Sequence, residues 1–131
     1  MNKGTLYTSY FAKLKQGKGI KVSIARFNPK WLKNEHIDDW FVDLAPSIEL
    51  LNDYKNDKCN WDEYENRYNK ELRDGYLVDA KINRMIETIR NLLNNGKDIT
   101  VYCYEKPTDN CHRHLLGQVF KELGFEVKEI E

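Results

Sequence analysis

The chain has 131 residues and a mass of 15.6 kDa, which fits one compact domain spanning residues 1–131. Its 21 basic residues balance 21 acidic ones, which excludes a positive field over the whole surface that would attract nucleic acid or membranes. Hydrophobic residues make up 40%, enough for a packed core, and no apolar run approaches the ~20 residues of a membrane span. The first residues lack the apolar core of a signal peptide, so we expect a cytoplasmic protein, and zero net charge favours some self-association, such as a homodimer.

The N-terminal part of the chain predicts two strands with a short helix between them. Residues 4–7 form a small apolar segment that is typical of a strand, and Thr8 or Ser9 is placed to cap a helix that runs to Leu14. Residues 20–25 alternate apolar and polar side chains, which indicates a strand with one polar face.

The middle of the chain predicts three helices, each with a recognisable start. Ser47 is the expected N-cap of the first, and Asn60 that of the second, which Gly75 is expected to end. Asp79 caps the third, whose apolar residues form a continuous stripe, and residues 95–96 (Asn-Gly) stop it.

The C-terminal part completes an alternation of strands and helices. Residues 99–104 are β-branched and aromatic, which indicates a central, buried, parallel strand. Asn110 is expected to cap a helix that Gly124 ends, and Phe125 starts a last strand. This order predicts the α/β class: a single small three-layer domain with a mainly parallel sheet of about four strands flanked by helices.

The densest cluster of chemically active side chains is residues 103–114, CYEKPTDNCHRH. This segment leaves the carboxyl end of the predicted central strand, where parallel sheets bind ligands, and enters a helix N-terminus, which favours anions. Because the helix dipole disfavours a cation there, Arg113 implies a neighbouring negative group. Glu105 is one candidate for that group, and a ligand phosphate is the other.

The three cysteines are Cys59, Cys103 and Cys111, too few and odd in number for a disulfide framework, so free thiols are expected in a reducing cytosol. The helix start and the neighbouring His112 and Arg113 favour the thiolate form of Cys111, which makes it a candidate nucleophile. The alternative for Cys111 is a ligand-contacting or packing role. Cys103 lies in a buried strand, where cysteine is more often a small apolar residue.

A zinc site is a further interpretation of the same segment, with Cys103, Cys111, His112 and His114 as its candidate ligands. Two histidines two positions apart on a helix point to different faces, and clustered CxxC pairs are absent from the sequence. We therefore predict no metal and no other cofactor.

The ends of the first two predicted strands should lie beside this segment. They present Ser9 and Tyr10, and then Arg26, whose guanidinium suits bidentate recognition of phosphate or carboxylate. The alternative for Arg26 is a salt bridge to Glu105 or Asp43. If Arg26 and the arginine of the late segment face one hollow, they form a polar, partly cationic pocket.

Four segments form a recognisable set: residues 5–10, 23–27, 103–107 and 111–114 (Cys-His-Arg-His). Together they resemble the domain of unknown function 488 family, and the resemblance covers essentially the whole chain. What the resemblance implies is a small cytosolic α/β domain with no established reaction, in which Arg26 matches the arginine that ends the family's second strand. Where many members have Asp-Val-Arg, this chain has Ile-Ala-Arg, so the acidic residue is missing. Two further segments, residues 44–47 and 61–64, are similar to the phage and Firmicute-type branch of the family.

The leading hypothesis is a domain that binds an anionic small molecule, a nucleotide or a phosphorylated metabolite, with hydrolysis or group transfer as the expected chemistry if turnover follows. Whether the protein is an enzyme stays open. One alternative is a nucleic-acid-binding module that uses a local basic patch and aromatic residues, although Trp61, Tyr64 and Tyr68 at helical spacing are more often core. Another is a non-catalytic interaction protein in which the Cys-His-Arg motif is a buried hydrogen-bond network. The candidate catalytic residues are Cys111, His112 and Glu105, and the candidate ligand-binding residues are Ser9, Tyr10, Arg26, Cys103, Lys106 and Arg113.

Overall fold

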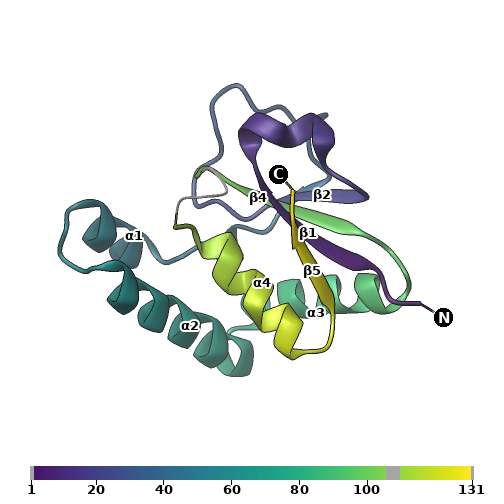
Figure 1. Cartoon of the computed structure of the whole chain (residues 1–131). Helices are drawn as coiled ribbons and strands as arrows, with labels where there is room; N and C mark the ends of the chain where they lie inside the picture. Colours follow the sequence, from purple (N-terminus) through teal and green to yellow (C-terminus); the bar gives the residue numbers. More distant parts are fainter. Residues whose placement is uncertain (1, 106–109, 131) are drawn as a thin grey trace.

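A single sheet of parallel strands organises the protein, whose structure is a computed structural model describing residues 2–105 and 110–130. Within those residues the sheet has five strands in the order β3-β2-β4-β1-β5, and the central strand β4 is buried along its whole length. Figure 1 shows β4 between β2 and β1. The predicted α/β class and the central strand are confirmed. The strands are β1 (Thr5–Tyr10), β2 (Ile20–Ser23), β3 (Asp39–Trp40), β4 (Ile99–Cys103) and β5 (Glu126–Glu129).

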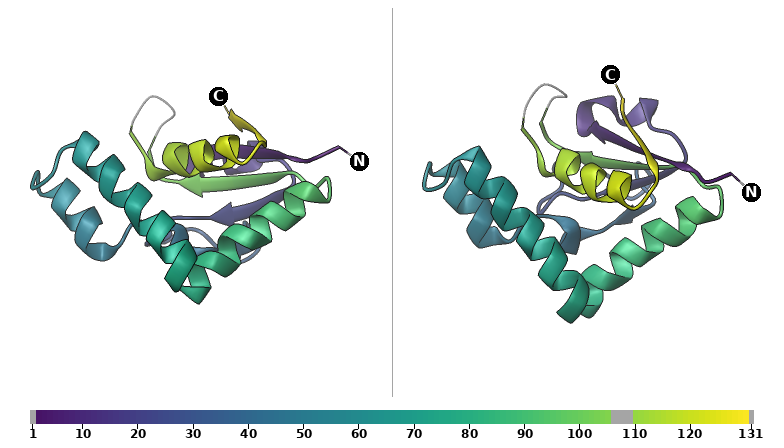
Figure 2. Two further views of the ribbon diagram at one scale, coloured as in Figure 1. Left: turned by 90° about the horizontal axis from the view of Figure 1, so that it is seen from below. Right: turned by 60° about the horizontal axis from the view of Figure 1, so that its bottom comes forward.

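Helices cover one face of the sheet and a 3₁₀ helix covers the other (Figures 1 and 2). Right-handed crossovers explain this arrangement, because the chain moves in one direction along the sheet from β1 to β2 and in the opposite direction from β3 to β4 and from β4 to β5. The part of the chain described has no helix with the length and apolarity to cross a membrane. The helices are α1 (Ile48–Lys55), α2 (Trp61–Val78), α3 (Ala80–Asn94) and α4 (His112–Glu122), with 3₁₀ helices η1 (Phe11–Gln16) and η2 (Val42–Leu44).

The sheet has a hydrophobic core on each face. The larger core lies against α2, α3 and α4 and includes Leu6, Ile99 and Phe120, all fully buried. The smaller core lies under η1, where the Tyr102 ring stacks with that of Phe11. Since both faces of β4 are covered, a continuous apolar run is the pattern this strand requires.

Three of the predicted helix N-caps are confirmed by side-chain hydrogen bonds. The Ser47 hydroxyl accepts from the amide of Leu50, and the Asn60 side chain accepts from the amide of Glu63. The Asp79 carboxylate accepts from the first amides of α3. Each cap satisfies a backbone donor that has no partner within its helix.

Several details of the predicted elements are wrong, and one strand, β3, was not predicted. Thr8 and Ser9 belong to β1, which runs to Tyr10, so they do not cap a helix. Gly75 does not end α2, because it lies inside the helix where a β-carbon would come within 2.4 Å of the Ile82 side chain; this glycine permits close packing of α2 on α3. Cys111, not Asn110, takes the N-cap position of α4. The short, exposed strand β3 has no alternating apolar pattern that would reveal it.

Replacing Asp79 with alanine should lower the free energy of unfolding by about 1 kcal/mol, because two amides at the start of α3 lose their acceptor. Urea unfolding followed by circular dichroism measures this change. Asp74→Ala is the matched control, since Asp74 is an exposed carboxylate on α2. An equal effect of both substitutions would contradict the capping role.

Candidate functional site

A cavity of about 420 Å³ lies where the carboxyl ends of β2 and β4 meet the start of α4. Its wall includes two cationic side chains, Arg26 and Lys55, and the cysteines and histidine of the late segment. This is the edge at which open parallel sheets bind ligands. The predicted location of the site therefore coincides with a real hollow in the structure.

Aromatic rings from two helices form another part of the cavity wall. Trp61 and Tyr64 of α2 stack with ring centroids 4.8 Å apart, and Tyr54 of α1 packs 4.9 Å from Tyr64. Tyr68, one turn further along α2, is fully buried, and its hydroxyl donates to the Leu44 carbonyl at 2.6 Å. The aromatic stripe expected to be core thus divides: Tyr68 is core, whereas Trp61 and Tyr64 also line the cavity.

Cys103 and Cys111 are joined by a disulfide, with 2.11 Å between their sulfur atoms. Cys103 ends β4 and Cys111 precedes α4, and both cysteines line the cavity. The expectation of free thiols is therefore wrong for this pair and confirmed for Cys59, a free and buried cysteine. The signal in the sequence was two cysteines flanking one strand-to-helix connection.

His112 is buried beside this pair with its two ring nitrogens in different surroundings. Its Nε2 lies 2.6 Å from the carbonyl oxygen of Ile24, and because a carbonyl only accepts, we assign the ring hydrogen to Nε2. The other nitrogen, Nδ1, then carries a lone pair and lies 3.7 Å from the sulfur of Cys111. Burial lowers the pKa of His112 to about 4, with Arg113 among the weaker causes, so the ring is neutral at pH 7.

Arg113 is fully buried and bonded on every side. Its Nε and Nη2 donate to the two carboxylate oxygens of Glu129 at 3.2 and 3.0 Å. Its Nη1 donates to the backbone carbonyl of Glu105 at 2.6 Å and to the sulfur of Cys103 at 3.0 Å. The Tyr10 ring lies 5.9 Å from the guanidinium carbon. For Arg113, this arrangement is the buried hydrogen-bond network that the hypothesis of a non-catalytic interaction protein predicted.

The negative group beside Arg113 is therefore Glu129 of β5, not the Glu105 carboxylate or a ligand phosphate. The sequence near the motif does not predict this partner, because Glu129 lies near Arg113 only as a result of the strand order of the sheet. Arg113 does not line the cavity with Arg26, so the expected shared hollow for the two arginines is not formed. Within the described ranges, Arg26 instead donates from Nε and Nη2 to the Pro46 carbonyl at 3.2 and 2.9 Å, and neither predicted salt bridge is present.

The remaining predicted site residues separate into three groups. Glu105 lies at the cavity and is exposed, and its charge contributes, after burial, to raising the pKa of Tyr64. Ser9 and Tyr10 lie in β1, away from the cavity lining, and the buried Ser9 hydroxyl has no hydrogen-bond partner among residues 2–105 and 110–130. Lys106 lies outside the described residues. Lys55 of α1, which is part of no motif in the sequence, also lines the cavity.

The donor atoms of Cys103, Cys111 and His112 lie within 4.8 Å of one another, all buried. Two thiolates and an imidazole are ligand types that zinc accepts, so these residues are the group in the described structure that suits a metal once the sulfurs are reduced.

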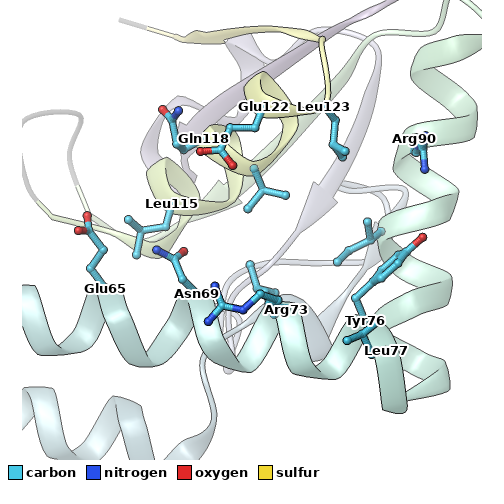
Figure 3. Close-up of a pocket in the computed structure, with 13 residues that line it drawn as sticks. Glu65, Asn69, Arg73, Tyr76, Leu77, Arg90, Leu115, Gln118, Glu122 and Leu123 are labelled. Atoms are coloured by element: carbon cyan, nitrogen blue, oxygen red, sulfur yellow. The ribbon is translucent and has the colours of Figure 1, made fainter.

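A larger groove of about 680 Å³ lies between α2, α3 and α4, where α2 and α3 diverge in a V (Figures 2 and 3). Its apolar floor includes Leu72 and Leu115, and charges of both signs surround it, among them Arg73 and Glu122. None of the predicted site residues lines this groove. The cavity at the strand ends is therefore the candidate site.

No curated protein and no solved structure gave a significant match to the chain. A family model described as the active DUF488-N3 subclade matches residues 6–124, which include all the cavity-lining residues named above. The placement in the phage and Firmicute-type branch stays a prediction. Because the match spans most of the chain, the protein belongs to the domain of unknown function 488 family, in the active DUF488-N3 subclade.

Proposed function

We propose that the protein binds an anionic small molecule, a nucleotide or a phosphorylated metabolite, in the cavity at the strand ends and acts on it with Cys111 and His112. The observation that carries the proposal is the composition of the cavity wall. Cationic side chains, stacked aromatic rings and a neighbouring cysteine and histidine line one hollow of about 420 Å³. A nucleotide has a phosphate that the cationic side chains can bind and a base that can stack on the aromatic rings.

Arg26 is the group best placed for the anion. Two of its N–H groups donate to the Pro46 carbonyl, which fixes the guanidinium at the cavity wall. A guanidinium has five N–H donors, so further donors remain for phosphate or carboxylate oxygens. Lys55 and the positive end of the α4 dipole add to the attraction.

The aromatic rings supply a surface for a base. Trp61 is partly exposed at the cavity and stacks on Tyr64, so a base that packs against Trp61 continues an existing stack. Base–aromatic stacking contributes about 1–3 kcal/mol per base. Trp61 therefore favours a nucleotide over a phosphorylated metabolite without a ring.

The chemistry requires Cys111 in its reduced form. The neutral His112 ring would accept the proton of the Cys111 thiol at Nδ1, and the thiolate would attack an electrophilic atom of the bound ligand. The bond from that atom to its leaving group would break, and the leaving group would depart with the bonding electrons and take up the proton from His112. The covalent adduct would then pass to water in a hydrolase or to a second acceptor in a transferase. The exposed Glu105 carboxylate at the cavity is placed to receive or supply a proton. The description of the subclade as active agrees with turnover.

Reduced protein should be stabilised by nucleotides in a thermal-shift screen of nucleoside mono-, di- and triphosphates and the matching nucleosides. At a ligand concentration 100 times Kd the expected stabilisation is about 2.7 kcal/mol. Arg26→Gln should weaken binding of the phosphorylated ligands about tenfold or more, measured by calorimetry, because a charge-assisted contact is lost.

Arg73→Gln, in the groove between α2, α3 and α4, is the matched control and should leave binding unchanged. Cys111→Ser should still bind ligand and should release no product in a mass-spectrometric assay. Absence of a shift with every phosphorylated ligand, or equal affinities of wild type and Arg26→Gln, would contradict the proposal.

A further inference from the structure

We propose that Cys103 and Cys111 form a reversible thiol–disulfide switch, reduced through the cavity by a small-molecule dithiol, and that the disulfide form holds the site inactive. That the bond controls catalysis rests on the proposed function, whereas the reversibility of the bond does not. Three features of the structure carry the inference: the access to the sulfurs, the group facing Cys103 and the group facing Cys111.

The sulfurs are reachable from one direction. Cys103 and Cys111 are 1% and 3% exposed, yet both line the cavity at the strand ends. A small thiol fits in a hollow of about 420 Å³ whose wall includes both cysteines. We therefore take a small-molecule dithiol as the reductant.

Cys103 faces a fixed cation. Nη1 of Arg113 lies 3.0 Å from the Cys103 sulfur, and two bonds to Glu129 and one to the Glu105 carbonyl hold the guanidinium in place. In the disulfide form the guanidinium meets a neutral sulfur, and in the reduced form it meets a group that can carry negative charge. A neighbouring cation favours the thiolate, and a stabilised thiolate favours the reduced form of the pair.

Cys111 faces a base instead. The lone pair on Nδ1 of His112 lies 3.7 Å from the Cys111 sulfur, because Nε2 is committed to the Ile24 carbonyl. The two sulfurs of the bond are thus unequal: Cys103 is the better leaving group, and Cys111 is the atom to be attacked.

These roles give a balanced reduction. One thiolate of a dithiol attacks the Cys111 sulfur, a mixed disulfide forms, and Cys103 leaves as a thiolate beside Arg113. The second thiol of the reductant then attacks its own sulfur in the mixed disulfide, and Cys111 leaves and takes up a proton next to His112. The protein pair gains two electrons and one proton, the second proton of the dithiol goes to solvent because Cys103 stays a thiolate, and the dithiol becomes a cyclic disulfide.

Reduction frees the atom that the proposed chemistry needs. While the bond to Cys103 exists, the Cys111 sulfur is not a thiolate and cannot form a covalent intermediate with a ligand. Oxidation therefore switches the proposed chemistry off.

Folded protein should be equilibrated with mixtures of reduced and oxidised dithiothreitol and then alkylated, and the number of alkyl groups should be measured by mass spectrometry. We expect Cys103 and Cys111 to be alkylated together, so that two alkyl groups are added at a time, whereas alkylation of the free Cys59 should not depend on theirs. Arg113→Gln should shift the equilibrium about tenfold toward the disulfide, ~30 mV for this two-electron couple. Arg90→Gln, an exposed arginine on α3, should leave it unchanged.

Arg113→Gln is used only if its circular dichroism matches that of wild type. Otherwise Arg113→Lys takes its place, because it keeps a cation but loses the planar group that contacts the Cys103 sulfur, and a smaller shift of the same sign is expected. Reduction of the pair only after unfolding would overturn the switch. Retention of one equivalent of zinc by the reduced protein through dialysis would also overturn it, in favour of a metal site on Cys103, Cys111 and His112.

Ligand assays on the two redox forms separate this inference from the proposed function. Turnover by the reduced form alone supports the switch, and equal turnover by both forms would overturn it while the proposed function stands. No binding by either form would overturn the proposed function and the control of catalysis, while the alkylation result would still decide whether the pair is reversible.

Discussion

Replacing Arg113 with alanine is expected to lower the free energy of unfolding of the reduced protein by about 2–3 kcal/mol. The Glu129 carboxylate, which is partly exposed, loses the bidentate pair and keeps the Thr8 hydroxyl as a donor. The Glu105 carbonyl loses the donor that the fully buried Arg113 side chain supplies. Loss of a buried hydrogen-bond and salt-bridge network is among the larger single causes of instability.

Urea unfolding in the presence of a reductant measures this effect without a contribution from the disulfide. Arg90→Ala is the matched control, because Arg90 pairs with Glu87 on the exposed face of α3 at 3.5 Å, and its loss should cost less than about 0.5 kcal/mol. In a double-mutant cycle, Arg113→Ala with Glu129→Gln should cost less than the sum of the single substitutions. A loss below about 1 kcal/mol for Arg113→Ala would show that the network does not support the fold.

Acidification should destabilise the protein through His112. Burial lowers the pKa of this ring from 6.5 to about 4 in the folded state. Between these values the unfolded chain binds a proton that the folded protein does not, so the free energy of unfolding falls as the pH falls from about 6.5 to about 4 and changes no further below that. The shift corresponds to roughly 3 kcal/mol.

The contribution of His112 is obtained by comparing wild type with His112→Asn over pH 4 to 7.5. Asn cannot titrate, so the difference in stability between the two proteins should shrink as the pH falls, while the carboxylates common to both cancel. His36→Asn is the control, because His36 lies outside the core and accepts a single hydrogen bond from the Lys33 amide. Parallel pH profiles for wild type and His112→Asn would contradict a buried neutral ring.

Local patterns predicted the elements of the fold, and long-range pairing decided what the patterns left out. Ser47, Asn60 and Asp79 cap helices as expected, because a cap depends on atoms only two or three residues away. The two-residue strand β3 was missed, since its pairing with β2 comes from the backbone and its side chains are exposed.

The sequence predicted the location of the candidate site but not the hydrogen-bond partners of its residues. The strand-end rule located Arg26, Cys111 and His112 at one cavity, because it depends only on the parallel sheet. The partner of Arg113 is Glu129, sixteen residues away in the last strand, and only the sheet order brings them together. No spacing in the sequence contains that information.

The most direct test of the proposed function is a crystal structure of the reduced protein with the nucleotide that gives the largest thermal shift. We expect its phosphate beside Arg26 and its base against Trp61, with the Cys111 sulfur facing the ligand. Ligand density in the groove between α2, α3 and α4, with the cavity at the strand ends filled only by water, would contradict the account.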